Sequence, residues 1–239
     1  MAPSAPPYWS FAGVVEGARL TLPLVPGTAF FGLVVGTLAA QKGLTLFEAV
    51  LMSGIVFAGA SQLVALEAWP DTWTLASVAS VALVTGTVNL RFFLMSASLR
   101  PWFGPLPAWQ SYAALSCLTD APWLVGMRYQ AGGGSDVGVF VGSGMSLWFI
   151  WVLFTFPGYL MGAIMDEPQR YGFDLVMPVF FVTMLVPLWR GARRAAPWLV
   201  AGLAGVAAAQ VVPGWWFIIV GALAGSIAAG LFGDERADA

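Results

Sequence analysis

The chain has 239 residues, of which 10 are Lys or Arg and 12 are Asp or Glu, so only 9% are charged. A soluble domain carries about 25% charged residues, whereas 59% of this chain is hydrophobic. A small globule cannot hide that much apolar surface from water. Composition therefore excludes a soluble enzyme, a secreted disulfide scaffold and a disordered chain. It predicts an all-α, polytopic bundle of transmembrane helices whose surplus apolar surface faces the lipid bilayer.

Further counts restrict the chemistry. The net charge is −2, which offers no basic surface to nucleic acid. There is no histidine, and Cys117 is the single cysteine, so the commonest metal ligand, the commonest general base and an internal disulfide are all missing. The sequence also lacks a zinc motif, a P-loop and a Ser/His pair. We expect no catalytic site, no metal and no cofactor.

The charged residues divide the chain at intervals near the 20 or so residues that a spanning helix needs. The expected segments, in chain order, cover residues 20–41, 49–66, 72–99, about 109–128, 137–165, 175–189 and two helices within 195–233. The last run has 39 uncharged residues, about 58 Å of helix and too long for one crossing. Pro213-Gly214 is expected to split it. We therefore predict seven to eight segments in a single membrane domain over 1–239, with flexible ends at 1–12 and 234–239.

Prolines mark the expected interruptions. Pro101, Pro105 and Pro107 are expected to make a break after the third segment, because proline ends helices. Asp120 and Pro122 interrupt the fourth segment. The fourth, sixth, seventh and eighth segments are the weakest as full crossings.

Positive charge in short loops predicts the orientation. With eight crossings, one side carries six arginines and the other side carries three basic residues. The first set is Arg19, Arg128, Arg190, Arg193, Arg194 and Arg236, and the second is Lys42, Arg100 and Arg170. This count favours both termini in the cytoplasm of a multi-pass protein of the bacterial inner membrane. If one weak segment does not cross, the predicted orientation of the C-terminal half is reversed.

Two stretches align without a gap at an offset of 126 residues and suggest an internal repeat with halves 13–130 and 137–233. Residues 30–50 and 156–176 share five identities in 21 positions, and Glu48 is matched by an aspartate. Transporter repeats are typically this weak, but convergent glycine packing in unrelated helices gives the same pattern. The offset carries the first segment onto the fifth, four segments later, and four full crossings from the first to the fourth segment would make the repeat parallel. An inverted repeat requires one segment, most naturally the interrupted fourth, that does not cross.

Glycines spaced four residues apart let helix backbones approach closely in lipid. Three such pairs occur, at Gly32 and Gly36, Gly158 and Gly162, and Gly221 and Gly225. We expect these pairs to lie at helix contacts. Glu48 is expected at a helix start, where a carboxylate complements the helix dipole.

The first two segments hold candidate substrate-binding residues. Pro23, Pro26 and Gly27 fall within five residues, which predicts either a helix that begins at Pro26 or a broken helix whose free amide groups face a cavity. In the second segment Ser53, Phe57 and Ser61 are spaced to share one helix face. Gly59 and Gln62 lie beside them. Such small and hydroxyl-bearing residues suit tight packing and a polar pocket equally.

The third and fourth segments hold the polar residues that are most costly in lipid, Asn89, Arg91 and Asp120. A charge inside the bilayer usually faces the bundle interior and finds a partner, so Arg91 and Asp120 are expected to pair if their helices are neighbours. The pair either fixes helix register or lies on a substrate or proton pathway. Asp120 is the only carboxylate away from the expected helix ends, which makes it the candidate proton carrier.

Several motifs in order carry a family resemblance. They are Arg19-Leu-Thr-Leu-Pro-Leu-Val-Pro-Gly27, Phe31-Gly32, Met52-Ser53, Phe57-Ala-Gly-Ala-Ser-Gln62, Val88-Asn-Leu-Arg91, Ser96-Ala-Ser-Leu99 and Thr119-Asp120. Together they resemble the AzlC family, the large subunits of bacterial branched-chain amino acid exporters, over about residues 13–190. One departure is Phe92, which stands where the family often has histidine, and any mechanism that relies on that histidine is in doubt for this chain.

The resemblance implies a permease that exports valine, leucine and isoleucine, with methionine as a further candidate. It also implies a small hydrophobic partner subunit of the AzlD type and coupling to the proton gradient. Two other functions are open from the residues alone: a passive pore for a small polar solute, and a structural assembly subunit whose glycine-rich faces only bind a partner. A pore needs a continuous polar lining, whereas the polar residues here cluster in the second to fourth segments.

Overall fold

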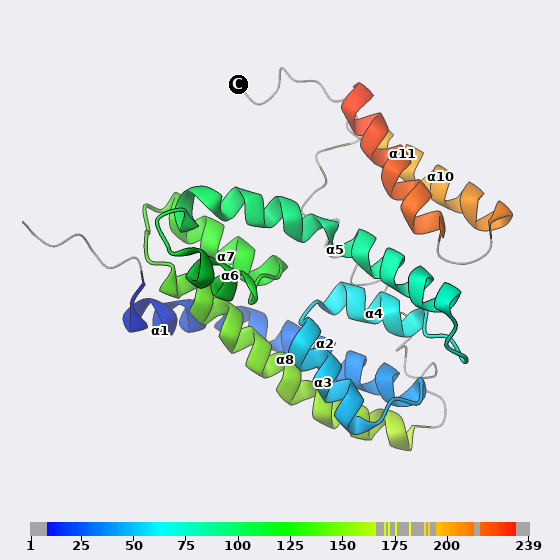
Figure 1. Ribbon diagram of the computed structural model, residues 1–239, viewed down its shortest axis with the longest axis horizontal. Coiled ribbons are helices and arrows are strands. Elements are labelled where there is room, and N and C mark those ends of the chain that lie inside the picture. The colour runs from blue at the N-terminus through cyan, green and yellow to red at the C-terminus, as the bar shows by residue number, and fades with distance from the viewer. Residues whose placement is uncertain are drawn as a thin grey trace, which may run out of the picture. The chain divides into compact units, whose positions relative to one another are not determined.

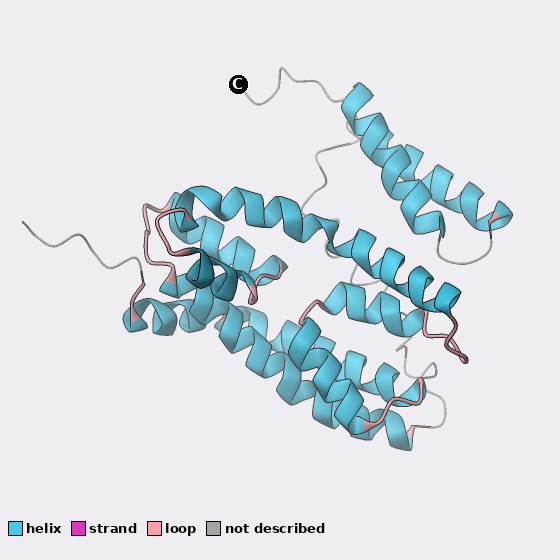
Figure 2. Cartoon of the chain, in the orientation of Figure 1, coloured by secondary structure: helices cyan, strands magenta, loops and turns pink. Residues whose placement is uncertain are grey.

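The computed structural model describes residues 9–165, 170, 172, 175, 182, 189, 191, 195–212 and 216–232. All regular elements in these ranges are helical (Figure 2), as the composition predicts. The sixth expected segment (175–189) falls almost entirely outside the described residues, as do residues 1–8, 234–239, Arg190, Arg193, Arg194 and Arg236. The chain divides into two compact units, Met1–Leu66 with Val88–Pro168 and Glu67–Thr87 with Gln169–Ala239.

The described helices are numbered as in Figure 1. They are α1 (Phe11–Leu20), the 3-10 helix η1 (Leu22–Leu24), α2 (Val25–Gln41), α3 (Leu46–Val56), α4 (Gly59–Glu67), α5 (Leu75–Phe103), α6 (Ala108–Leu115), α7 (Asp120–Ala131), α8 (Gly138–Ile164), α10 (Ala196–Val211) and α11 (Trp216–Phe232).

In the first unit, α2 lies beside α8 and runs in the same direction (Figure 1). The Thr37 hydroxyl donates to the Gly158 carbonyl at 2.9 Å, and near the start of both helical runs the Thr21 and Ser146 hydroxyls lie 2.9 Å apart. A Cβ added at Gly158 would collide with the backbone of Leu33. The expected role of the glycine pairs in close helix packing is therefore confirmed for this contact.

The chain from Phe11 to Gln41 follows a nearly continuous helical course. The flexible end expected at residues 1–12 overlaps the first helix by two residues, because α1 begins at Phe11 with Ser10 as its cap. Pro23 lies in the first turn of the 3-10 helix and Pro26 in the first turn of α2. A missing N–H is harmless at a first turn, so the prolines mark a helix start.

The helix α5 is longer than expected. The expected break is present, since α5 ends at Phe103 and α6 begins at Ala108 directly after Pro107, although Pro101 itself lies inside the last turn of α5. A proline one residue into the last turn removes a single backbone hydrogen bond, and the helix then stops within three residues. The fourth segment is interrupted as predicted, because α6 ends at Leu115 and α7 begins at Asp120.

A hydrophobic core joins the end of α5 to α6, α7 and α8. Trp102, Phe103 and Phe140 form edge-to-face aromatic contacts at its centre, which add attraction beyond simple burial. Phe92 packs against this cluster. The indole of Trp102 donates to the carbonyl of Ser135 at 2.9 Å. The core therefore holds the break before α7 at a fixed place against α5.

The second unit contains a hairpin of α10 and α11. Gly221 faces Ala201 and Gly205, and Gly225 faces Ala201 and Pro197, so the two helices run antiparallel. The expected division of the last apolar run into two helices is confirmed, and so is the packing role of Gly221 and Gly225.

Three described helical stretches are long and apolar enough to cross a membrane: Phe11–Gln41, Leu75–Phe103 and Gly138–Ile164. The helices Leu46–Val56, Ala196–Val211 and Trp216–Leu231 are apolar but shorter. These stretches support a helical membrane protein. The number of crossings and the internal repeat stay predictions.

Glu48 lies at a helix start, as expected. The Thr45 hydroxyl accepts from the Glu48 N–H, and the Glu48 carboxylate accepts from the Thr45 N–H at 2.7 Å and from its hydroxyl at 2.8 Å. These hydrogen bonds to Thr45 lower the pKa of the exposed Glu48 carboxyl. This reciprocal cap fixes the start of α3.

Candidate functional site

The second expected segment is broken in its middle. The helix α3 ends at Val56, and Phe57 adopts a left-handed conformation with φ 37° and ψ 48°. The helix α4 then begins at Gly59. Left-handed backbone is uncommon and costly for a bulky side chain, so the surrounding packing must hold Phe57 in place. The prediction of one helix with Ser53, Phe57 and Ser61 on a shared face is therefore wrong.

Polar side chains gather at this break and are fully buried. The Gln62 amide of α4 donates to the Ser53 hydroxyl of α3 at 3.3 Å. The hydroxyls of Ser53 and Thr155 lie 3.1 Å apart, which adds α8 to the cluster. The Ser61 hydroxyl donates to the Ala58 carbonyl at 2.9 Å. All four side chains are almost inaccessible to solvent, so the break encloses a small polar centre within apolar helices.

Two tryptophans of α8 close the break from one side. The indole of Trp148 donates to the Gly54 carbonyl at 2.9 Å, where α3 ends and carbonyls lose their helical partners. One turn further, Trp151 contacts the Phe57 ring edge-on at 6.4 Å between centroids. A Cβ added at Gly59 would come within 2.7 Å of the Trp151 ring, so a larger residue there would force this ring to move.

Sequence reasoning missed Thr155, Trp148 and Trp151. They lie in the 29-residue uncharged run of residues 137–165, where tryptophans are typical of helix packing and interfacial anchoring. Thr155 is a hydroxyl-bearing residue deep inside a predicted span, and that is the one signal that could have pointed to the polar centre.

The predicted ion pair is present. Nη2 of Arg91 lies 3.0 Å from Oδ2 of Asp120, and the two side chains are 27% and 30% exposed. Asp120 is the first residue of α7 rather than the middle of a continuous helix, with Thr119 at the cap position. The Trp123 indole donates to the Ser98 hydroxyl of α5 at 2.9 Å. This bond and the ion pair fix the start of α7 against α5.

The remaining predicted residues lie apart from these two groups or at their margin. Asn89 is half-buried, two residues before Arg91, and its side-chain oxygen is buried with no hydrogen-bond partner among the described residues. Pro26 and Gly27 are exposed, and a Cβ at Gly27 would meet nothing within 4 Å. The structure therefore forms two separate groups, one of predicted residues at the break in the second segment and one at the Arg91–Asp120 ion pair. The Pro26-Gly27 pair belongs to neither group.

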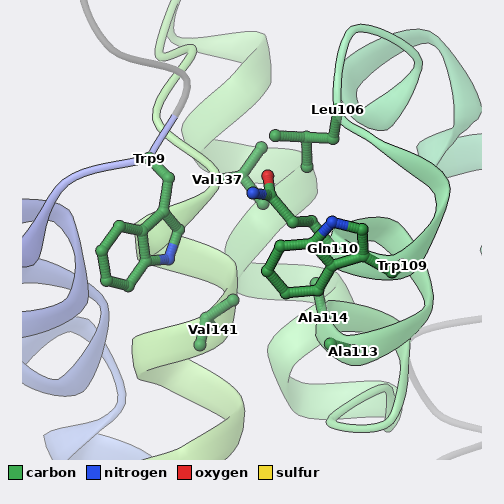
Figure 3. Close-up of a pocket in the computed structure, with 8 residues that line it drawn as sticks. All are labelled: Trp9, Leu106, Trp109, Gln110, Ala113, Ala114, Val137 and Val141. Atoms are coloured by element: carbon green, nitrogen blue, oxygen red, sulfur yellow. The ribbon is translucent and has the colours of Figure 1, made fainter.

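The first unit also contains a cavity of about 320 Å³ away from both groups. Figure 3 shows Trp9 on one side and Trp109 and Gln110 on the other, with Val137 and Val141 between them. The lining is largely apolar and includes none of the predicted site residues. Such a lining suits an apolar group more than a zwitterion.

The comparisons with known proteins identify one family. No curated protein and no solved structure matches the chain. The family described as AzlC protein matches residues 23–165, a range that covers more than half of the 239 residues and includes the broken helix and the ion pair. The chain therefore belongs to the AzlC family.

Proposed function

We propose that the chain is a secondary transporter that exports branched-chain amino acids, namely valine, leucine and isoleucine, with methionine as a further candidate. Export takes place across the bacterial inner membrane, is driven by the proton gradient, and requires a small hydrophobic subunit of the AzlD type. The observation that carries the proposal is the break between α3 and α4, which encloses buried polar side chains within an apolar segment. Membership of the AzlC family supports an exporter of this type.

A broken helix suits an amino acid because its two ends have opposite character. The start of α4 presents backbone N–H groups and the positive end of a helix dipole, which favour a carboxylate. The end of α3 presents carbonyl groups, which favour an ammonium group. Secondary transporters commonly bind substrate at such discontinuous helices near the middle of the membrane.

The apolar walls of the break suit a branched side chain. The Phe57 ring is buried against Trp151, and Met52 is half-buried one turn earlier on α3. Apolar contacts of this kind discriminate only weakly between side chains that differ by one methylene, by roughly 10- to 200-fold. Several branched-chain substrates sharing one site are therefore expected.

The ion pair of Arg91 and Asp120 is the proposed proton pathway. Protonation of Asp120 would remove its charge and release Arg91, which gives the transporter two electrostatic states. Arg91 belongs to α5 and Asp120 begins α7, so proton binding at Asp120 can be linked to movement of these two helices.

Counterflow of radiolabelled L-valine in proteoliposomes tests the proposed function. The chain is reconstituted with and without an AzlD-type subunit, and uptake is followed with an imposed pH gradient and without one. Without a pH gradient, we expect labelled valine to accumulate only when unlabelled valine is present inside. An imposed pH gradient should drive accumulation without internal valine. Flux that ignores the gradient and shows no counterflow would indicate a pore, and no flux in the presence of the partner would indicate an assembly role.

A further inference from the structure

Two neighbouring tryptophans of α8 differ in one respect. The indole N–H of Trp148 donates to the Gly54 carbonyl, whereas the buried indole N–H of Trp151 has no hydrogen-bond partner among the described residues. Trp151 is only 5% exposed. Leaving a buried donor unpaired is unfavourable, and native structures seldom tolerate it without a reason.

A second unpaired group belongs to the same break. Gln62 is 2% exposed, and its amide nitrogen is held by the Ser53 hydroxyl. Its Oε1 has no partner among the described residues. The contact between the Ser53 and Thr155 hydroxyls keeps Ser53 in place. The Gln62 amide therefore has a hydrogen-bonded nitrogen and an oxygen that is available to accept a hydrogen bond.

The two groups are complementary in chemistry and belong to the same break. Cζ2 of Trp151, two bonds from the indole nitrogen, lies 3.5 Å from the position of a Cβ on Gly59. Gln62 is three residues after Gly59 and therefore about one turn along α4. The break thus contains an unpaired hydrogen-bond donor, the indole N–H of Trp151, and an unpaired acceptor, Oε1 of Gln62.

From these observations we propose that Trp151 and Gln62 recognise the main-chain ends of a free α-amino acid. The Trp151 indole N–H donates to the substrate carboxylate, and Gln62 Oε1 accepts from the substrate ammonium group. This inference rests on the proposed transport function and deepens it, because it separates recognition of the zwitterion from recognition of the side chain. Both side chains are almost closed to solvent.

Binding of three related ligands to the full chain, purified together with the AzlD-type subunit, tests the proposal. The probes are L-valine, isobutylamine, which lacks the carboxylate, and isovalerate, which lacks the ammonium group. Trp151→Phe keeps an aromatic ring and removes the donor. Loss of a hydrogen bond to a charged group is expected to weaken valine binding about 10-fold or more. Isobutylamine has no carboxylate, so its affinity should stay within about 2-fold of the wild type.

The reciprocal variant tests the acceptor. Gln62→Leu should weaken valine and leave isovalerate unchanged, and Gln62→Glu, which restores an acceptor, should recover valine binding. Trp102→Phe is the matched control, because its indole is bonded to the Ser135 carbonyl in the core around Phe140 and does not belong to the break; valine affinity should change by less than about 2-fold.

Equal loss of valine and isobutylamine in Trp151→Phe would overturn the proposed contact and indicate simple damage to packing. Wild-type valine affinity in that variant would also overturn it and leave the transport proposal standing. A wild-type chain that binds no valine would instead overturn the proposed substrate class.

Discussion

Arg91 of α5 and Asp120, the first residue of α7, form an ion pair with Nη2 3.0 Å from Oδ2. The two side chains come from different predicted segments, and each is less than one-third exposed. Removing one partner leaves the other charge in a poorly solvated place, where a charged hydrogen bond is worth roughly 1.5–3 kcal/mol.

Loss of either charge is therefore expected to reduce valine export. Asp120→Asn and Arg91→Ala should each lower the initial rate about 10-fold or more in proteoliposomes, and Asp120→Asn should also abolish the response to a pH gradient, because asparagine cannot carry the proton. A double variant that exchanges the two residues, Arg91→Asp with Asp120→Arg, distinguishes a structural role of the ion pair from a role in proton transfer. Recovery of thermal stability without recovery of transport supports the proton pathway, whereas normal export by both single variants would contradict it.

The sequence predicts this pair because charges inside lipid are rare and must find partners. It cannot predict the break after Val56, because nothing in Phe57 itself favours a left-handed backbone. That conformation is imposed by tertiary packing against Trp151. Trp151 cannot be singled out in the uncharged run of residues 137–165, where the hydroxyl of Thr155 is the one signal, while Ser53 and Gln62 are visible as polar residues within an apolar segment.

The left-handed backbone of Phe57 at the break can be tested by substitution. Phe57→Leu and Phe57→Val both reduce the contact with Trp151, but a β-branched residue is much less tolerant of positive φ. Phe57→Val should therefore be less stable than Phe57→Leu by about 1 kcal/mol or more, measured as thermal unfolding in detergent. Equal stabilities would mean that the left-handed turn is not present in the membrane.

The close packing of α2 on α8 predicts that Gly158 cannot be replaced by a larger residue without loss of stability. In Gly158→Val the new side chain would meet the backbone of Leu33, which cannot move aside, and overpacking of this kind costs about 1–3 kcal/mol. The unfolding temperature should fall clearly. Gly27→Ala is the control on α2, since its Cβ meets nothing within 4 Å. A loss of transport without loss of stability in Gly27→Ala would return the Pro26-Gly27 pair to the substrate site.

The direction of α8 relative to the helical run Phe11–Gln41 predicts which ends of these helices lie on the same side of the membrane. Hydrogen-bonded pairs along the contact are separated by 126 residues at Ser10 and Asp136, 125 at Thr21 and Ser146, and 121 at Thr37 and Gly158. Because both members of each pair advance together, the two runs are parallel. The separations are also close to the 126-residue offset of the suggested repeat, so matched residues lie at similar levels.

Cysteine labelling can test this arrangement, since Cys117 is the single native cysteine and Cys117→Ser gives a blank background. Phe11→Cys and Ala131→Cys should react with an impermeant maleimide from one side of the membrane, and Gln41→Cys and Ile164→Cys from the other; all four positions are exposed. Labelling of Phe11→Cys and Ala131→Cys from opposite sides would contradict a parallel pair. The expected result requires an odd number of crossings between α2 and α8, and it would relate the halves of any true repeat by an axis along the membrane normal rather than by inversion.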